Sequence, residues 1–256
     1  MNQGPIRFNA IAAHRYGRKH SDPPGSNQWD DSNASGRVVI AIHGMAMDSA
    51  TSWFTLAPLL SQSGFRVFTF DYGRHGQGWL ARPRGRGDGL PGVGHTARCA
   101  EELNDFVDRV ISATGAESVA LVGHSFGALV AQYYLLRCDG AARVSHFVGL
   151  APTVHGTTFN GLLRVPGAPR LGARLVGANI AEQAVGSDLL TELYRDGDTA
   201  DGVHYTVISP RWDEFTTPVR AQRLEGATNL RLQGWAEHVL MLYTREALER
   251  VVAALN

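Results

Sequence analysis

The chain has 256 residues, a length that suits one large α/β domain or two small domains. Hydrophobic residues make up 44% of it and charged residues 19%, which is ordinary for a globular protein with a full core. Lys plus Arg and Asp plus Glu number 24 each, so the formal net charge is zero, which argues against nucleic acid as a partner and against strong attraction to acidic lipid. Arg82, Arg84 and Arg86 stand among glycines as a local exception, and we expect them to lie in a solvated loop.

The cysteines and the N-terminal residues bear on redox chemistry and location. Cys99 and Cys138 are too few for a disulfide framework or a metal cluster and should lie at distant helix ends, so we expect free thiols. No stretch approaches about 18 apolar residues, so no membrane span is expected. Residues 1–20 are basic and have no apolar core, unlike a signal peptide. The chain as written is expected to be cytoplasmic, with the mature part of a secreted protein as the alternative.

The β signals begin after a turn-rich connector at residues 21–36, which closes an N-terminal extension (residues 1–36) expected to pack on the core. Residues 37–256 are expected to form a single domain. It contains several short, nearly continuous apolar runs, as in strands that are covered on both faces. These runs predict strands at residues 37–42, 65–70, 118–122, 144–150, 203–208 and, more weakly, 229–233.

Helical patterns alternate with these strands, which predicts a mostly parallel sheet of about six strands with helices on both faces. Residues 157–201 interrupt the alternation, because they contain many apolar residues and glycines but no strand signal. We expect an insertion over the carboxyl edge of the sheet, either a fixed cap or a mobile lid. The predicted helices are residues 53–61, 96–114, 126–137 and 237–256.

The candidate nucleophile is Ser125, in the sequence Gly-His-Ser-Phe-Gly at residues 123–127. This G-x-S-x-G pattern directly follows an apolar strand and directly precedes a helix with small residues. In that context it is typical of a sharp, strained turn that exposes the serine Oγ, with glycines that let the neighbouring backbone approach closely. The alternative is a purely structural turn.

A serine hydroxyl needs a base, and in this type of site the acid and then the histidine follow the serine along the chain. His238 follows the last predicted strand, where a loop can aim its imidazole at Ser125, so we predict that it is the base. Asp213 follows the strand before last and is the predicted acid that orients the imidazole. Glu214 is its competitor.

Two backbone N–H groups are needed where the carbonyl oxygen of a substrate becomes anionic. Phe126, directly after the nucleophile, and Met45, in the loop after the first strand, are the predicted donors. Because backbone groups stabilise this charge, the chemistry needs no cofactor and no metal. The predicted substrate pocket is lined by His43, His124, His155 and Phe159.

Most of the chain resembles the bacterial class 2 triacylglycerol lipases, a branch of the α/β hydrolases common in actinomycetes. Residues 148–158, with Gly-Leu-Ala-Pro followed by His-Gly-Thr-Thr, are the most specific part of the match. Residues 71–78 instead resemble the loop of general α/β-hydrolase esterases. The resemblance implies the α/β-hydrolase fold and carries the triad roles over to Ser125, Asp213 and His238. Further matching segments are residues 23–29, 123–125 with 133–135, and 205–208 with 213–214 and 217–218.

These features predict a serine hydrolase that cleaves small-molecule or lipid esters, an esterase or a lipase, by way of an acyl-enzyme. Amidase, polyester hydrolase, lactonase and acyltransferase use the same triad and remain alternatives. A ligand-binding protein without catalytic activity is the alternative from another class, because fold alone does not fix function.

Overall fold

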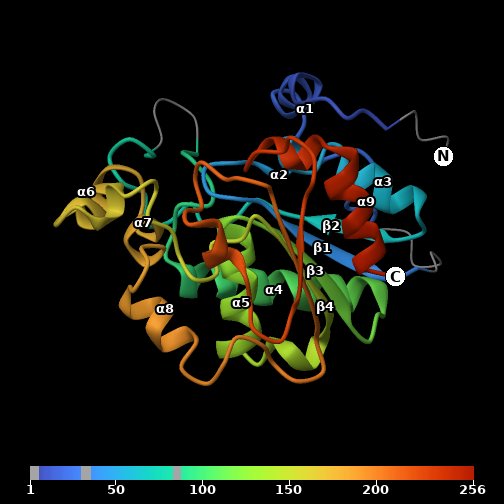
Figure 1. The fold of residues 1–256 in the computed structure, drawn as a ribbon. Helices are drawn as coiled ribbons and strands as arrows, with labels where there is room; N and C mark the ends of the chain where they lie inside the picture. Colours follow the sequence, from blue (N-terminus) through green and yellow to red (C-terminus); the bar gives the residue numbers. More distant parts are fainter. Residues whose placement is uncertain (1–5, 30–35, 83–87) are drawn as a thin grey trace.

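A six-stranded sheet forms the centre of the protein, in a computed structural model that describes residues 6–29, 36–82 and 88–256 (Figure 1). The strand order is β2-β1-β3-β4-β5-β6, and every neighbouring pair is parallel. The predicted parallel sheet of about six strands is therefore confirmed. The strands are β1 (Val38–Ile42), β2 (Arg66–Thr69), β3 (Val119–His124), β4 (Val144–Leu150), β5 (His204–Ser209) and β6 (Thr228–Arg231).

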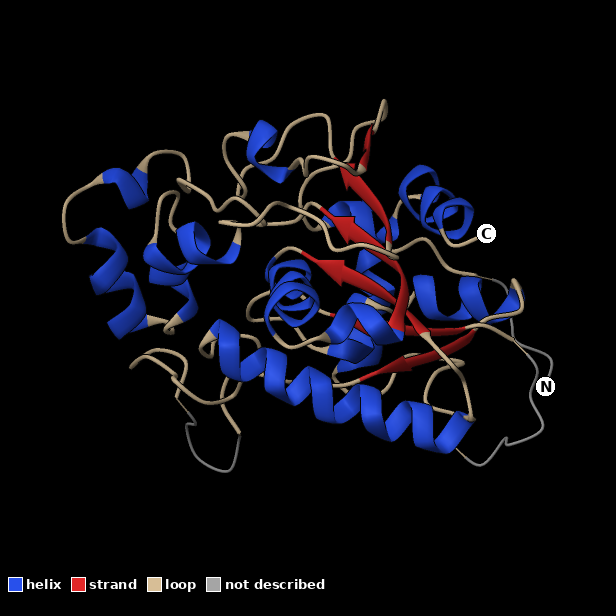
Figure 2. Cartoon of the chain, turned by 90° about the horizontal axis from the view of Figure 1, so that it is seen from below, coloured by secondary structure: helices blue, strands red, loops and turns tan. Residues whose placement is uncertain are grey.

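Helices cover both faces of this sheet, as Figure 2 shows from below. Val38, Ile40 and Ile42 of β1 pack in the core cluster that contains α4 (Thr96–Thr114) and α5 (Phe126–Arg137). The alternate β1 residues pack in the second cluster, with α3 (Leu56–Gln62) and α9 (Arg245–Ala254). Because successive side chains of a strand point to opposite faces, a strand between two helix layers must be apolar throughout. This explains the continuous apolar runs in the sequence.

Two of the four predicted helices have the predicted bounds, α4 and α5, and the other two need correction. The helix predicted at residues 53–61 begins only at Leu56, as α3, and a separate short helix that was not predicted, α2 (Ser49–Ser52), precedes it. Asp48 caps α2 by accepting from the amide of Thr51 at 2.7 Å. The helix predicted at residues 237–256 begins only at α9, after a short 3-10 turn, η4 (Leu240–Tyr243). Thr244 separates η4 from α9, because its backbone is extended (φ −103°, ψ 137°).

The N-terminal residues contain a helix that the sequence reading did not predict, α1 (Ala10–Gly17). Asn9 caps it by accepting from the amide of Ala12 at 2.9 Å, and Ala13 is its buried residue. The ring of Tyr16 lies 5.2 Å from that of Phe54. These contacts join the extension to the helices next to β1.

The segment of residues 157–201 is folded into short helices that Figure 1 shows grouped together, α6 (Ala168–Leu175), α7 (Asn179–Glu182) and α8 (Asp188–Leu193). A 3-10 turn, η2 (Leu162–Arg164), precedes them. The remaining 3-10 turns of the described chain are η1 (Gly140–Arg143) and η3 (Val219–Gln222).

The remaining predictions about single residues have mixed outcomes. Cys99 is buried and Cys138 is half-buried, and both are free. Of the predicted solvated loop, Arg82 is exposed, whereas Arg84 and Arg86 lie outside the described residues. No helix within residues 6–29, 36–82 and 88–256 is long and apolar enough to cross a membrane.

Candidate active site

Ser125 lies at the turn between β3 and α5 with a backbone conformation that is rare outside glycine (φ 52°, ψ −119°). Two glycines make this turn possible. A Cβ on Gly123 would meet the Ala128 backbone at 2.5 Å, and one on Gly127 would collide with the carbonyl oxygens of Ile42 and His43. The sequence Gly-His-Ser-Phe-Gly therefore folds into a turn that only glycine at both ends permits, and it raises the serine Oγ at the carboxyl end of the sheet.

His238 joins this serine to an aspartate. Its Nε2 lies 2.8 Å from Ser125 Oγ, and its Nδ1 lies 2.7 Å from Asp213 Oδ2. All three side chains are buried. Since a carboxylate can only accept, Nδ1 carries the proton, and Nε2 presents its lone pair to the serine hydroxyl. The structure thus brings together the three residues that the sequence selected from distant parts of the chain.

Four hydrogen bonds fix the carboxylate of Asp213. Its Oδ1 accepts from the amides of Phe215 and Thr216 at 2.8 and 2.7 Å. Its Oδ2 accepts from Gln222 Nε2 at 2.8 Å, in addition to His238. Glu214, the competing acid, approaches only the backbone amide of His238, at 3.4 Å. The orientation of the imidazole therefore depends on Asp213.

Gln222 is a site residue that sequence reasoning missed. It is completely buried on the turn η3, nine positions after Asp213, and belongs to no motif. Only the return of the chain from η3 toward the β5 edge brings it to the carboxylate. Gln222 can be recognised as a site residue only once the structure places its buried side-chain amide next to Asp213.

Of the predicted oxyanion donors, Phe126 directly follows Ser125 in the chain and Met45 lines the same cavity as Ser125. Phe126 is the first residue of α5, where N–H groups have no acceptor within the helix. Within the described chain, no acceptor is found for the amide of Met45, whose side chain lines the cavity next to Ser125. Two amides without a partner beside a nucleophile can stabilise a developing negative charge.

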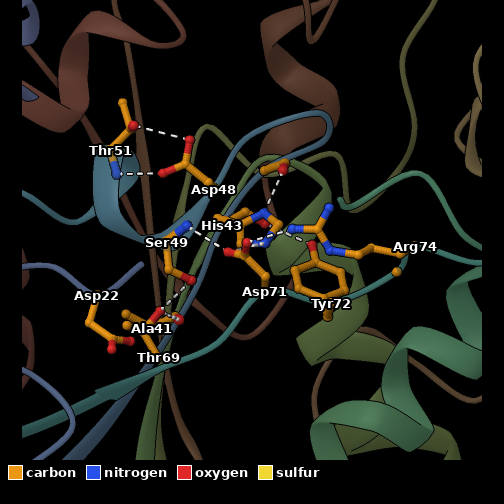
Figure 3. A network of polar contacts seen from close by, with 12 residues as sticks. Asp22, Ala41, His43, Asp48, Ser49, Thr51, Thr69, Asp71, Tyr72 and Arg74 are labelled. Carbon is orange, nitrogen blue, oxygen red and sulfur yellow. Dashed lines mark hydrogen bonds and ion pairs between the residues drawn. The ribbon is translucent and has the colours of Figure 1, made fainter. Parts of the chain in front are cut away.

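His43 lies behind this loop and does not line the cavity, which corrects the prediction made for it. Its Nδ1 donates to the carbonyl of Gly44 at 2.8 Å, and its Nε2 lies 3.6 Å from Asp71 Oδ1 (Figure 3). Tyr72 donates to the carbonyl of His43 at 2.7 Å. Burial lowers the pKa of His43, so the ring stays neutral. His43 therefore supports the backbone that leads to Met45.

His124 does line the cavity, and it also contacts the loop of the base. Its Nε2 donates to the carbonyl of His238 at 2.9 Å. Burial, and after it the nearby His238, lower the pKa of His124 to about 3. The ring is therefore neutral at physiological pH and acts as a hydrogen-bond donor to the backbone of His238.

The cavity beside Ser125 has a volume of about 100 Å³. Phe159 lines it, as predicted for the pocket, whereas His155 does not. His155 Nε2 instead lies 3.0 Å from Asp198 Oδ2, because the segment of residues 157–201 returns this aspartate to the end of β4. The cavity is lined by Met45, Met47, His124, Ser125, Thr153, Phe159, Gln183, Phe215, Thr216, His238 and Val239.

Among the described residues, no group of three or more His, Cys, Asp or Glu side chains is placed to hold a metal ion.

A parallel α/β sheet with a strained serine at its carboxyl edge is the architecture of a hydrolase fold. The chain belongs to the alpha/beta hydrolase fold family, whose model matches residues 37–213. The membership is consistent with the sheet, the turn at Ser125 and the position of His238 after the last strand.

Solved structures with the same fold include lipases. Aspergillus fumigatus lipase B has a TM-score of 0.72 and 20% identity over 91% of this chain and 55% of that chain. Bacillus licheniformis lipase BlEst2 in its mature form has a TM-score of 0.64 and 16% identity over 92% and 96%. The enol-lactonase from Burkholderia xenovorans LB400 has a TM-score of 0.54 and 17% identity over 90% and 94%. The chain thus spans just over half the length of the Aspergillus lipase, and similarities at these identities show the fold.

Proposed function

We propose that this protein is a serine hydrolase that cleaves carboxylic esters, with Ser125 as nucleophile, His238 as base and Asp213 as the acid that orients it. The observation that carries the proposal is the continuous hydrogen-bonded chain from Ser125 Oγ through His238 to Asp213, at 2.8 and 2.7 Å. A structural serine has no need of a backbone at positive φ or of a buried imidazole supported by a carboxylate.

In the proposed reaction, Ser125 Oγ attacks the ester carbonyl carbon while His238 Nε2 takes the hydroxyl proton. The carbon–oxygen bond to the alcohol then breaks, and the alcohol leaves with the proton from His238. Water repeats the sequence on the acyl-enzyme, releasing the acid and restoring Ser125. Asp213 stays ionised throughout and stabilises the imidazolium.

The amides of Met45 and Phe126 are proposed to bind the carbonyl oxygen as it becomes negative. Each such donor is worth roughly 10²–10³ in rate in known hydrolases. The support of His43 behind the Met45 loop, at 2.8 Å from the carbonyl of Gly44, gives the loop a fixed backbone geometry. No cofactor is required for this chemistry.

The cavity favours a short acyl group. Its volume of about 100 Å³ is well below the roughly 300–1,000 Å³ of pockets that bury drug-sized ligands. The apolar side chains of Met45, Met47, Phe159 and Phe215 line it, which suits a small hydrocarbon chain. Of the two activities that the resemblance to class 2 lipases implies, we therefore propose esterase activity on short esters as the main one.

A series of p-nitrophenyl esters from acetate to palmitate tests the proposal. Wild-type protein should hydrolyse the shortest members best, and Ser125→Ala should lower the rate by about 10⁶. Ser63→Ala is the matched control, because Ser63 is exposed and only bonds the carbonyl of Leu59. Absence of turnover in the wild type would favour a ligand-binding protein without catalysis, and activity in Ser125→Ala would contradict the nucleophile.

A further inference from the structure

Helix α6 lies away from the sheet (Figure 1), and the chain around it exposes several large apolar side chains. Leu171 of α6 is 57% exposed, and Leu162 and Val165 before it are 63% and 54% exposed. Trp79, on the loop after β2, is 65% exposed. Soluble monomers rarely expose large apolar side chains in a group, and such groups mark binding surfaces.

Backbone hydrogen bonds hold α6 and the Trp79 loop together. The amides of Gly78, Trp79 and Leu80 donate to the carbonyls of residues 176, 174 and 175 at 2.8, 2.9 and 2.7 Å. Ala178 returns a bond to the carbonyl of Gly76 at 3.2 Å. The exposed side chains of residues 79, 162, 165 and 171 therefore belong to one folded unit, called here the α6 face.

Arginines on α6 point outward beside these apolar groups. A Cβ on Gly172 would meet Ile180 Cγ2 at 2.5 Å, so the Gly172 side of α6 faces α7. Arg170 and Arg174 are two residues on either side of Gly172, about 200° around a helix, and thus point away from α7. Both are exposed, as is Arg164 in η2.

The α6 face carries positive charge without acidic neighbours in its own segments. No Asp or Glu occurs in residues 157–181 or in residues 72–82. Within the described chain, Arg164, Arg170 and Arg174 form no ion pair. Of the acids that flank these segments, Glu182 is engaged with Thr96 and His95, at 2.7 and 2.8 Å, and Asp71 pairs with Arg74 at 2.9 Å. Asp88 is exposed, and its carbonyl accepts from Gln77 Nε2 at 3.3 Å.

We propose that the α6 face docks on an anionic phospholipid surface. Exposed Leu, Val and Trp side chains can enter the boundary between headgroups and acyl chains, where tryptophan is favoured, and arginines beside them bind lipid phosphates. An RNA or an acidic protein would match the charge but would leave the aliphatic side chains without a purpose. Phe159 of the cavity precedes Leu162 by three residues, so docking brings the cavity close to the lipid surface.

Docking is tested by co-sedimentation with phosphatidylcholine vesicles, with and without phosphatidylglycerol. The Ser125→Ala chain is used so that no lipid is hydrolysed, and the result is independent of the proposed esterase function. The protein should sediment with the mixed vesicles and should be released by salt. Arg170→Gln with Arg174→Gln should weaken partitioning roughly thirtyfold, because each arginine near such a surface contributes about 1 kcal/mol. Leu171→Ser should weaken it roughly tenfold through lost apolar contact.

The matched control is Arg220→Gln with Arg223→Gln, two exposed arginines near the edge strand β6 that also form no ion pair with a described residue. This pair should sediment like the parent, and equal unfolding midpoints would show that all variants are folded. The proposal would be overturned if both double arginine variants lost vesicle binding equally, or if neither lost it. It would also be overturned if the protein bound vesicles with and without phosphatidylglycerol equally well. Retained binding to RNA but not to vesicles, or a dimer that the Leu171→Ser variant dissolves, would replace the lipid with another partner.

Discussion

The carboxylate of Asp213 is held by more donors than an orienting acid requires, and Gln222 is the one that can be removed by a single substitution. Gln222→Met keeps the volume and removes the 2.8 Å bond to Oδ2. Because three other donors remain, we expect kcat to fall about tenfold, near the lower value for a hydrogen bond to a charged group, with KM unchanged. Gln62→Met, at an exposed residue of α3, is the control.

Steady-state kinetics on a short ester checks this positioning role. A rise in KM with unchanged kcat would mean that Gln222 shapes the cavity instead. An unchanged kcat/KM would mean that the two amides and His238 suffice to hold the carboxylate.

At the scale of residues, the sequence pointed to Ser125, His238 and Asp213, with Glu214 as a competing acid, and the first three lie within hydrogen-bond distance of one another in the structure. Whether they act as a triad stays a prediction. Sequence reasoning failed for His43 and His155, which follow strands as pocket residues do. Which way an imidazole points there depends on partners far away in the sequence, Asp71 for one and Asp198 for the other.

At the scale of elements, the segment of residues 157–201, which we propose to be a cap, is the one whose mobility matters most for substrate access. Four backbone hydrogen bonds join the end of α6 and the residues after it to residues 76–80. In addition, Glu182 of α7 accepts from both the amide and the hydroxyl of Thr96, at 2.8 and 2.7 Å. These contacts favour a fixed cap over a mobile lid. Rates on esters of increasing length should therefore saturate below the solubility limit of each ester.

A rate that rises sharply once the ester forms an emulsion would contradict the fixed cap. The measurement is initial rate against concentration through the solubility limit, repeated with Glu182→Ala. If the cap is fixed by these contacts, only the variant should show a rise at the limit, because the loosened α7 can then move.

Elements were predictable where burial imposes a pattern. The β1, β3 and β4 runs are apolar because helices cover both faces, and α4 has an apolar stripe because one side faces the sheet. The break at Thr244 was not predictable, because Leu240 and Leu248 are spaced as in one helix although Leu240 is 46% exposed. Periodicity gives the spacing of apolar residues, but it does not show whether the helix between them is unbroken.

At the scale of the whole molecule, net charge is a poor guide to local charge. The sum of zero comes from acids and bases that are unevenly distributed, and the α6 face lies in segments of the chain that contain arginines and no acid. A net charge of zero opposes attraction of the average surface to acidic lipid, whereas the proposed docking concerns one basic face of the molecule.

Acid sensitivity is the global property that the site predicts. Burial and His238 lower the pKa of His124 to about 3 from 6.5. Between these values the unfolded chain binds one more proton than the folded chain, so stability is lost as pH falls through this range. His124→Gln cannot titrate, and its free energy of unfolding should depend less steeply on pH, by about 1.4 kcal/mol per pH unit.

Urea unfolding at several pH values between about 4 and 6 measures this slope. His43, whose pKa is also lowered by burial, titrates in both proteins and cancels from the comparison. Parallel slopes for wild type and His124→Gln would show that His124 is protonated equally in the folded and unfolded chains.

Ser125 is proposed to be a nucleophile that is activated by His238. Reaction with a fluorophosphonate, followed by peptide mass spectrometry, tests it without knowledge of the natural substrate. The account predicts one adduct, on Ser125, that is absent in Ser125→Ala and strongly slowed in His238→Ala, because the hydroxyl loses its base. An adduct on another serine, or equally fast labelling of the His238→Ala protein, would contradict it.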